Sequence, residues 1–277
     1  MRNQTYPKVL IIAGSDPSGG AGIQADIKTC TALGVYAMAA ITALTAQNTR
    51  GVTGVQAVSS DFLRRQLETI LDDIRPDAVK IGMIPNAECC GVIADIIGEY
   101  NLENVVTDPV MVATSGDALS TPEAVECMTG RLLPLSGLVT PNIPEAEVLT
   151  GMKISGSADM RKCVEDIIMR FGCDGVILKG GHDLTSDRIT DYIAVSQCGH
   201  IEVSPFIHRK VITENTHGTG CTLSSAIAAH LALGFDAREA ASRAIIWLTQ
   251  ALDSGKNFNI GHGHGPVNHL FGIHPII

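Results

Sequence analysis

Residues 8–33, KVLIIAGSDPSGGAGIQADIKTCTAL, run from a short aliphatic segment through a glycine-rich turn into a helical pattern. The β-branched run at 8–13 predicts a buried strand, and the segment 21–33 predicts a helix. A strand that enters a helix through such a turn is the start of a βαβ unit. This stretch therefore predicts an α/β protein.

The same alternation continues along the chain and indicates a single domain over residues 1–277. Strands in parallel sheets are covered on both faces and read as continuous apolar runs. We therefore predict a three-layer αβα fold with a mainly parallel central sheet. Further strands are predicted at 36–44, 77–81, 104–107, 138–140, 175–179, 188–195 and 201–203. Further helices are predicted at 59–72, 86–100, 121–132, 144–149, 158–171, 218–233 and 237–252.

The composition disfavours several classes of partner. The 277 residues are 45% hydrophobic, and the formal net charge of -9 comes without a run of Lys or Arg. Such a chain is poorly suited to bind nucleic acid or an anionic membrane surface. The apolar run at 9–13 is too short for a signal peptide or a membrane span. No two cysteines form a C-x-x-C pair, so we expect reduced thiols in a cytoplasmic protein.

Polar and glycine-rich segments follow the predicted strands. In parallel sheets, ligands bind outside the carboxyl ends of the strands. We therefore expect these segments to converge on one edge of the sheet and to form one site. They are residues 14–16, 47–48, 82–83, 108–109, 140–142 and 179–181.

The strongest local signal is NTHGTGCT at residues 215–222, which runs into the predicted helix 218–233. Small residues let the backbone N–H groups of Gly218, Thr219 and Gly220 point at one centre. The helix N-terminus adds about half a positive charge there. The pattern favours an anion hole for a transferring phosphoryl group. The alternative is a glycine-rich turn that only leads into a core helix.

Cys221 lies in the first turn of that predicted helix. A helix N-terminus lowers the pKa of a thiol, so we expect a lowered pKa for Cys221. Such a group could accept a proton from an attacking hydroxyl. The alternative is a small residue that packs the start of the helix.

Four other polar residues are candidates for the same site. Asp26, one helical turn beyond Gly22, could bond a substrate hydroxyl or amine, or could be a solvated helix carboxylate. Asn142 and Glu145 have the spacing of two oxygen ligands that hold Mg²⁺ through water, or of a helix cap. Lys179 ends a predicted strand, where it could pair with nucleotide phosphates or extend into solvent.

Two glycine-rich segments fit no nucleotide or metal motif. Residues 13–22 have neither G-x-G-x-x-G nor G-x-x-x-x-G-K-[ST] spacing, so neither a dinucleotide fingerprint nor a P-loop is supported. The GHGHGP segment at 261–266, with His269 and His274, has flexible spacing and no carboxylate or thiol partner. We expect a loop near the site or a subunit contact there instead of a metal site.

Several blocks, in this order, carry a very specific resemblance over nearly the whole chain. They are AGSDPSGGAGIQADIKT (13–29), TALTAQNT (42–49), KIGM (80–83), DPVM with SG (108–111 and 115–116), TPNIPE (140–145), KGGH (179–182) and NTHGTGCTLSSA (215–226). Together they resemble the hydroxymethylpyrimidine/phosphomethylpyrimidine kinases of thiamine biosynthesis, within the ribokinase-like superfamily.

The resemblance implies a ribokinase-like fold, in which a central sheet is flanked by helices, and usually a homodimer. It also implies the reaction. The γ-phosphoryl group of ATP would move onto the hydroxymethyl group of 4-amino-5-hydroxymethyl-2-methylpyrimidine. The enzyme would then phosphorylate that monophosphate to the pyrophosphate. ATP and Mg²⁺ would be required.

The resemblance also implies roles for single residues. Asn142 and Glu145 would organise Mg²⁺ and phosphate. Lys179 and Thr216 would contact ATP, and Cys221 would stand where most of the superfamily has an Asp base. The anion hole would be formed by Gly218, Thr219 and Gly220. The pyrimidine pocket would use Gly14, with Asp26 and Gln47 for ring and amino nitrogens, and Met83 and Val110 for the ring faces.

Three alternatives remain open. A pyridoxal or pyridoxine kinase shares the fold and much of the motif set, but Gln47 and Met83 favour the pyrimidine by resemblance. A sugar kinase would need a more polar pocket than Gly14, Met83 and Val110 supply. A non-catalytic sensor that binds the pyrimidine would have no need of the phosphoryl-transfer residues.

Overall fold

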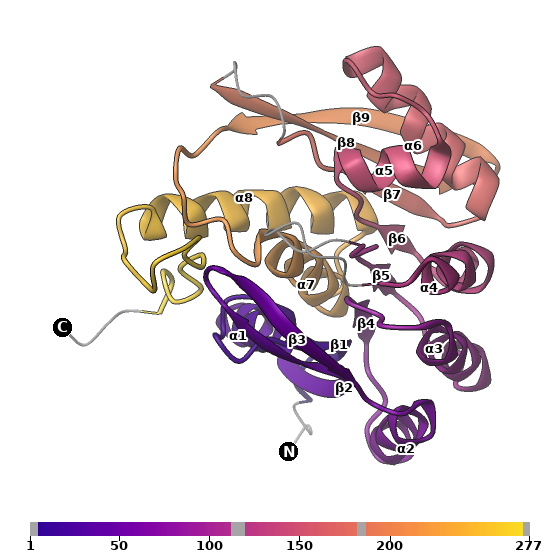
Figure 1. Cartoon of the computed structure of the whole chain (residues 1–277). Coiled ribbons are helices and arrows are strands. Elements are labelled where there is room, and N and C mark those ends of the chain that lie inside the picture. Colours follow the sequence, from indigo (N-terminus) through magenta and orange to yellow (C-terminus); the bar gives the residue numbers. More distant parts are fainter. Residues whose placement is uncertain (1–4, 112–119, 182–186, 274–277) are drawn as a thin grey trace.

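The computed structural model describes residues 5–111, 120–181 and 187–273 (Figure 1). In this part of the chain, nine strands form one sheet in the order β3-β2-β1-β4-β5-β6-β7-β8-β9. The strands from β2 to β7 in that order run parallel, whereas β3 pairs antiparallel with β2 at one edge. At the other edge, β8 and β9 are antiparallel. The predicted mainly parallel sheet is confirmed.

The elements alternate as the sequence predicts. The strands are β1 (Lys8–Ser15), β2 (Tyr36–Asn48), β3 (Gly51–Ala57), β4 (Ala78–Ile81), β5 (Val105–Thr107), β6 (Leu138–Val139), β7 (Gly175–Leu178), β8 (Arg188–Gln197) and β9 (His200–Arg209). The helices are α1 (Gly22–Ala32), α2 (Ser60–Leu71), α3 (Ala87–Glu99), α4 (Pro122–Cys127), the π-helix η1 (Met128–Leu132), the 3-10 helix η2 (Leu133–Leu135), α5 (Ile143–Thr150), α6 (Ser157–Phe171), α7 (Thr219–Ala232) and α8 (Ala237–Gly255).

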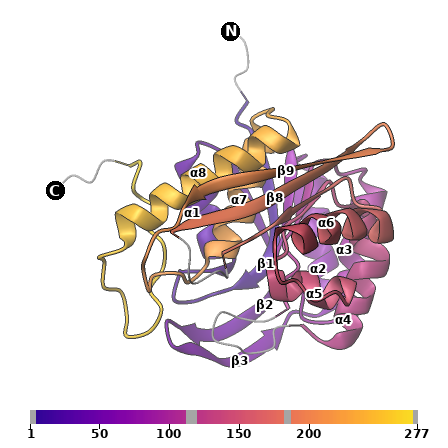
Figure 2. The same ribbon diagram turned by 90° about the horizontal axis from the view of Figure 1, so that it is seen from above.

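The sheet is the middle of three layers. Helices α1, α7 and α8 cover one face, and α2 to α6 cover the other (Figures 1 and 2). Side chains along β1 alternate between the two cores: Leu10 and Ile12 pack on the side of α2 and α3, and Val9 and Ile11 on the side of α7. Because both faces are covered, the whole strand is apolar, which is why its sequence shows no polar alternation.

Two edge strands differ from the prediction. Strand β3 was not predicted, because Gly51 and Gly54 lower strand propensity and many of its residues are exposed. Strand β9 extends well beyond the predicted 201–203, through Pro205, which lies opposite Tyr192. Proline is tolerated there because β9 is the last strand of the sheet and needs no further hydrogen-bonding neighbour.

A buried ion pair ties the sheet to two helices. The Lys80 Nζ of β4 lies 2.9 and 2.8 Å from the two carboxylate oxygens of Asp26 in α1. The Ser225 hydroxyl of α7 donates to the same carboxylate at 2.7 Å. All three side chains are fully buried. Burial lowers the pKa of Lys80, but the Asp26 carboxylate outweighs it and the net direction is upward, so the lysine stays charged.

We expect Lys80→Met to lower the free energy of unfolding by about 3–5 kcal/mol, because it leaves the Asp26 carboxylate buried without a counter-charge. Urea denaturation followed by circular dichroism measures this loss. The matched control is Lys8→Met, since Lys8 pairs with Asp77 at 2.9 Å on the surface and such pairs contribute below about 1 kcal/mol. Equal losses for both variants would show that the buried pair does not hold the layers together.

Candidate active site

The carboxyl ends of the parallel strands bring several predicted segments together. A side chain on Gly14, at the end of β1, would place its first carbon 2.9 Å from the Met83 sulfur. Beyond β6 and β7, Asn142 and Lys179 form an isolated parallel bridge. The predicted convergence of these segments on one edge of the sheet is confirmed for Gly14, Met83, Asn142 and Lys179.

Two buried carboxylates share one lysine at this edge. Lys179 Nζ lies 3.2 Å from Asp108 and 3.9 Å from Glu145, and the Thr140 hydroxyl donates to Asp108 at 2.9 Å. Burial raises the pKa of Glu145 to about 7, and Asp108 adds to the rise while Lys179 opposes it. Burial lowers the pKa of Lys179, but the two carboxylates raise it overall. The lysine is therefore charged, and the carboxylates offer hard oxygen ligands.

Asn142 and Glu145 form a capping box at the start of α5. The Glu145 backbone N–H donates to the Asn142 side chain, and the Asn142 backbone N–H donates to the Glu145 carboxylate, both at 2.8 Å. The capping alternative is thus confirmed. Because one carboxylate oxygen of Glu145 makes this bond, its side chain is fixed next to Lys179.

The predicted anion hole lies at the N-terminus of α7. Gly218 caps the helix at φ 78°, a left-handed conformation that glycine adopts most readily. A side chain on Gly218 would collide with the Gly20 carbonyl. A carbon added to Gly220 would lie 3.3 Å from Asp108 Oδ2 and 3.7 Å from Lys179 Nζ. The first turn of α7 therefore lies beside Asp108 and Lys179.

The residues around this turn lie near the cap. The Thr216 carbonyl accepts a hydrogen bond from the Thr219 N–H at 3.3 Å and so begins the helix. Thr222 donates its hydroxyl to the Gly218 carbonyl at 2.8 Å. Both contacts fix the shape of the loop, and the first of them occupies the Thr219 N–H, one of the three groups predicted for the anion hole.

The expectation of a lowered pKa at Cys221 is wrong. Burial raises the pKa of this thiol to about 11, and Asp26 and Asp108 add to the rise. Lys80 and a backbone hydrogen bond from Gly22 lower it, but do not compensate. The helix N-terminus alone suggested a thiolate, whereas burial in the first place, and the carboxylates of Asp26 and Asp108 in addition, favour the neutral thiol. At neutral pH the thiol keeps its proton.

Asp26 is not solvated in this structure. Its side chain is fully buried, and both oxygens bind Lys80. The alternative of a solvated helix carboxylate is therefore wrong, whereas a bond from Asp26 to a substrate hydroxyl or amine stays a prediction. Lys80 itself was missed, although a lysine inside the apolar strand AVKI was the available signal.

The other predicted pocket residues have fixed neighbours. Gln47, near the end of β2, contacts the Thr45 hydroxyl at 3.1 Å. The Met83 carbonyl accepts from Thr42 at 2.7 Å. The Val110 carbonyl accepts from Ser120 at 2.9 Å. Ser115, Gly116, His182 and His274, which the sequence analysis also names, lie outside the described residues.

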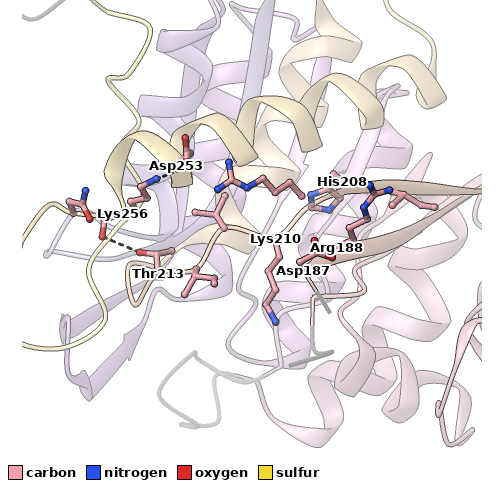
Figure 3. A pocket seen from close by; sticks show the side chains of 12 residues that line it. Asp187, Arg188, His208, Lys210, Thr213, Asp253 and Lys256 are labelled. Carbon is pink, nitrogen blue, oxygen red and sulfur yellow. Dashed lines mark hydrogen bonds and ion pairs between the residues drawn. The ribbon is translucent and has the colours of Figure 1, made fainter. Parts of the chain in front are cut away.

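A cavity of about 1000 Å³ lies where the start of β8, the end of β9 and the C-terminal end of α8 meet, and it was not predicted from any motif (Figure 3). Ile207, Val211 and Ile212 give it apolar walls, and Ile212 is 89% exposed. From Thr213, which also lines it, the chain runs directly to the cap of α7. Its remaining lining residues are Asp187, Arg188, His208, Arg209, Lys210, Asp253, Lys256 and Asn257.

The GHGHGP segment lies as a loop beside the site. The backbone N–H groups of His262 and Gly263 donate to the Thr49 hydroxyl at 3.2 and 3.1 Å, in the turn between β2 and β3. His269 contacts the Thr222 hydroxyl of α7 at 2.9 Å, and burial lowers its pKa to about 4. The expectation of a loop near the site is confirmed.

No helix within the described residues has the length and apolar character needed to cross a membrane.

Comparison with known proteins places the chain in a family. The family model described as phosphomethylpyrimidine kinase matches residues 16–268. The hydroxymethylpyrimidine/phosphomethylpyrimidine kinase of Bacillus subtilis is 44% identical over 263 residues, which cover 95% of this chain and 94% of that protein. A thiamine biosynthesis bifunctional protein of Geobacter sulfurreducens is 48% identical over 271 residues, or 97% of this chain and 54% of that longer protein.

A solved structure matches the fold. The ADP complex of Bacillus subtilis pyridoxal kinase superposes with a TM-score of 0.86 at 35% sequence identity. The superposition covers 96% of this chain and 98% of that one. The predicted ribokinase-like α/β fold is confirmed.

The raised pKa of Cys221 predicts slow alkylation. A pKa of about 11 instead of 9.0 leaves about 100-fold less thiolate at pH 8 than an ordinary thiol has, and thiolate is the reactive form. We expect iodoacetamide to modify Cys221 correspondingly slowly, with a rate that keeps rising toward pH 11. Peptide mass spectrometry over a series of pH values measures this rate.

The exposed Cys198 is the internal control in the same digest. If Cys221 reacts faster than Cys198 at pH 7, the helix N-terminus dominates after all, and the thiolate is preformed.

Proposed function

The chain belongs to the phosphomethylpyrimidine kinase family, and from this premise we propose how its site works. It is a phosphotransferase of thiamine biosynthesis. It phosphorylates the hydroxymethyl group of 4-amino-5-hydroxymethyl-2-methylpyrimidine and then the resulting monophosphate, giving the pyrophosphate. The observation that carries the mechanism is the first turn of α7, which faces Asp108 and Lys179 across Gly220.

ATP, which the kinase family uses, would occupy the cavity in Figure 3. Ile207, Val211 and Ile212 would contact the two faces of the purine ring, since such pockets are mostly apolar with a few polar groups. The chain leads from this cavity to the α7 N-terminus, so the phosphates would extend toward Gly218. Lys179 and Thr216 would contact them there.

The donor set near Lys179 fits Mg²⁺. Asp108, Glu145 and Asn142 supply carboxylate and amide oxygens, which this small hard cation prefers, usually with several waters retained. When bound, Mg²⁺ neutralises charge on the phosphates. Asp108 was given no role from the sequence, although it opens the DPVM block and is buried beside Lys179.

The chemical step depends mainly on position and charge. The hydroxymethyl oxygen attacks the γ-phosphorus in line while the bond from the γ-phosphorus to the β,γ-bridging oxygen breaks and ADP leaves, and the hydroxyl proton passes to an oxygen of the transferred phosphoryl group. The N–H groups of Gly218, Thr219 and Gly220 would stabilise the charge on the transferring group. Cys221 lies at the same helix turn, where it would contact the hydroxymethyl group. Its raised pKa makes it a weak proton acceptor in the free protein, and a metaphosphate-like transition state needs little help from a base.

The pyrimidine would lie between the ends of β1 and β4. Met83 and Val110 would contact the ring faces, and Gly14 allows the close approach because a side chain there would meet Met83. Gln47 would bind the ring and amino nitrogens. Asp26, bound to Lys80, would shape the floor of this pocket.

Three further properties belong to this proposal. The chain would act as a single kinase domain and as a homodimer. The enzyme would work in the cytoplasm, where thiols remain reduced. All eight cysteines are described and free, which supports a reducing compartment.

The likeness to a pyridoxal kinase supports pyridoxal as a second acceptor. Purified protein with Mg-ATP is therefore offered hydroxymethylpyrimidine, its monophosphate, pyridoxal or ribose, and ADP and the phosphorylated products are measured. We expect turnover of both pyrimidines and little of ribose. Preference for pyridoxal would assign the protein to vitamin B6 salvage, and pyrimidine binding without ADP formation would leave a sensor.

We expect Gly220→Ala to lower kcat by about 100- to 1000-fold, as much as the loss of one oxyanion-hole donor costs, although alanine keeps the backbone N–H. The added carbon would occupy the space between Asp108 and Lys179, where the phosphoryl group must pass. Cys221→Ala should lower kcat by less than about 100-fold, which is the smallest contribution typical of a general base. Steady-state kinetics on the pyrimidine measure both.

Gly98→Ala is the matched control, because Gly98 lies in α3 with open space around it. It should leave kcat unchanged and raise the helix stability slightly. A larger loss in Cys221→Ala than in Gly220→Ala would restore Cys221 as the principal catalytic group.

A further inference from the structure

Two glycine-rich turns that are about 200 residues apart in the sequence are joined by one carboxylate. Asp16, in the turn between β1 and α1, accepts hydrogen bonds from the backbone N–H groups of Ser18 at 2.8 Å, Gly20 at 3.2 Å and Ala21 at 2.8 Å. The same carboxylate lies 2.8 Å from Nε2 of His217, in the turn before α7. Asp16 therefore fixes its own turn and binds the other one.

This contact is buried and built for an ionised carboxylate. Asp16 is 2% exposed and His217 is 7% exposed. Burial alone raises the pKa of Asp16, but the bonds from His217, Ser18 and Ala21 outweigh it and lower the pKa to about 2. A buried carboxylate with this many donors is held in one position, unlike an ion pair on the surface.

The two turns touch through their backbones. A side chain on Gly20 would collide with the His217 ring, and one on Gly218 would collide with the Gly20 carbonyl. No atom can be inserted between them, so the position of Gly218 follows the position of the Asp16 turn. Gly218 is the cap from which the anion hole of α7 begins.

His217 is also held from behind. Its backbone N–H donates to the Gly265 carbonyl at 3.0 Å, and it forms a bridge with Pro266. The neighbouring Asn215 donates to the carbonyls of Gly255 and Phe258, both at 2.8 Å. The His217 ring is thus confined between the C-terminal segment and the Asp16 turn. This confinement holds its Nε2 against the Asp16 carboxylate.

We propose that Asp16 and His217 are positioning residues that hold the anion hole in register with the acceptor side of the site. The proposal rests on the phosphotransferase function proposed above. Asp16 follows Gly14 and Ser15 at the end of β1, beside the pocket assigned to the pyrimidine, and His217 precedes the hole that stabilises the phosphoryl group. The pair sets the relative position of acceptor oxygen and phosphoryl group, on which rate depends steeply.

If Asp16 and His217 align the acceptor oxygen with the phosphoryl group, their loss should lower kcat and leave nucleotide binding intact. The cavity assigned to ATP is lined by the ends of β8, β9 and α8 and by neither Asp16 nor His217. His217→Leu should therefore lower kcat by at least about tenfold, with the KM for ATP changed by less than about twofold. The loss should be the same for the pyrimidine and for its monophosphate.

His217→Gln is the conservative rescue, because its amide N–H can reach toward the Asp16 carboxylate while the imidazole is lost. We expect it to recover most of the kcat that His217→Leu loses. Asp16→Asn places an amide N–H opposite the backbone N–H groups that now donate to the carboxylate, so two donors face each other. We expect it to lower kcat as much as His217→Leu does. The double variant should lose little more than either single one, since both remove the same contact.

Thermal melting is recorded for every variant. Full kcat in His217→Leu with a lowered melting temperature, or a raised KM for ATP at unchanged kcat, would show a merely structural clamp and overturn the proposal. So would a failure of His217→Gln to recover kcat at a restored melting temperature. The acceptor used is whichever one the wild type phosphorylates, so a wrong substrate assignment does not affect this test. If the wild type phosphorylates none of the acceptors, the proposed function fails. The rate of ATP hydrolysis is then measured instead, and the proposal requires His217→Leu and Asp16→Asn to lower it.

Discussion

The buried group of Asp26, Lys80 and Ser225 is the interaction on which the site depends. It joins α1, the central strand β4 and α7, which are the three elements that bring the two glycine turns to one edge of the sheet. A full charge pair at zero exposure is stable only with close geometry and further hydrogen bonds, so it tolerates little displacement of either helix. The fold thereby fixes the start of α7 before any ligand binds.

The glycines follow from that constraint. With α1 and α7 held against the same strand, the turns that precede them must pass each other at backbone distance. Gly20 and Gly218 have no room for a side chain, and Gly218 also needs a positive φ. The result is a rigid helix N-terminus that faces Lys179 and the carboxylates of Asp108 and Glu145.

Much of this could be predicted from the sequence, and the limits have physical causes. The alternation of apolar runs predicted the parallel sheet, and the position of polar segments after strands predicted their convergence, because both depend on local pattern. The edge strand β3, the pairing of Asp26 with Lys80, the contact of Asp16 with His217 and the cavity near Ile212 depend on which segments the folded chain brings together. The expectation of a lowered pKa for Cys221 was wrong for the same reason, since the burial of the thiol and the approach of Asp26 and Asp108 arise only in the fold.

The raised pKa of Cys221 explains why a thiol suits position 221. The site already holds the carboxylates of Asp26, Asp108 and Glu145 near two lysines, and the acceptor can itself carry a phosphate in the second reaction. A carboxylate at position 221, beside Asp26 and Asp108, would add a negative charge where a negatively charged group must enter. Both neighbours would also oppose its ionisation. A thiol with a pKa of about 11 adds no charge at neutral pH, and in the proposed site it would still place sulfur close to the reacting hydroxyl. A thiol at position 221 would therefore leave the helix N-terminus and Lys179 free to bind the phosphoryl group, whereas a carboxylate there would compete for both.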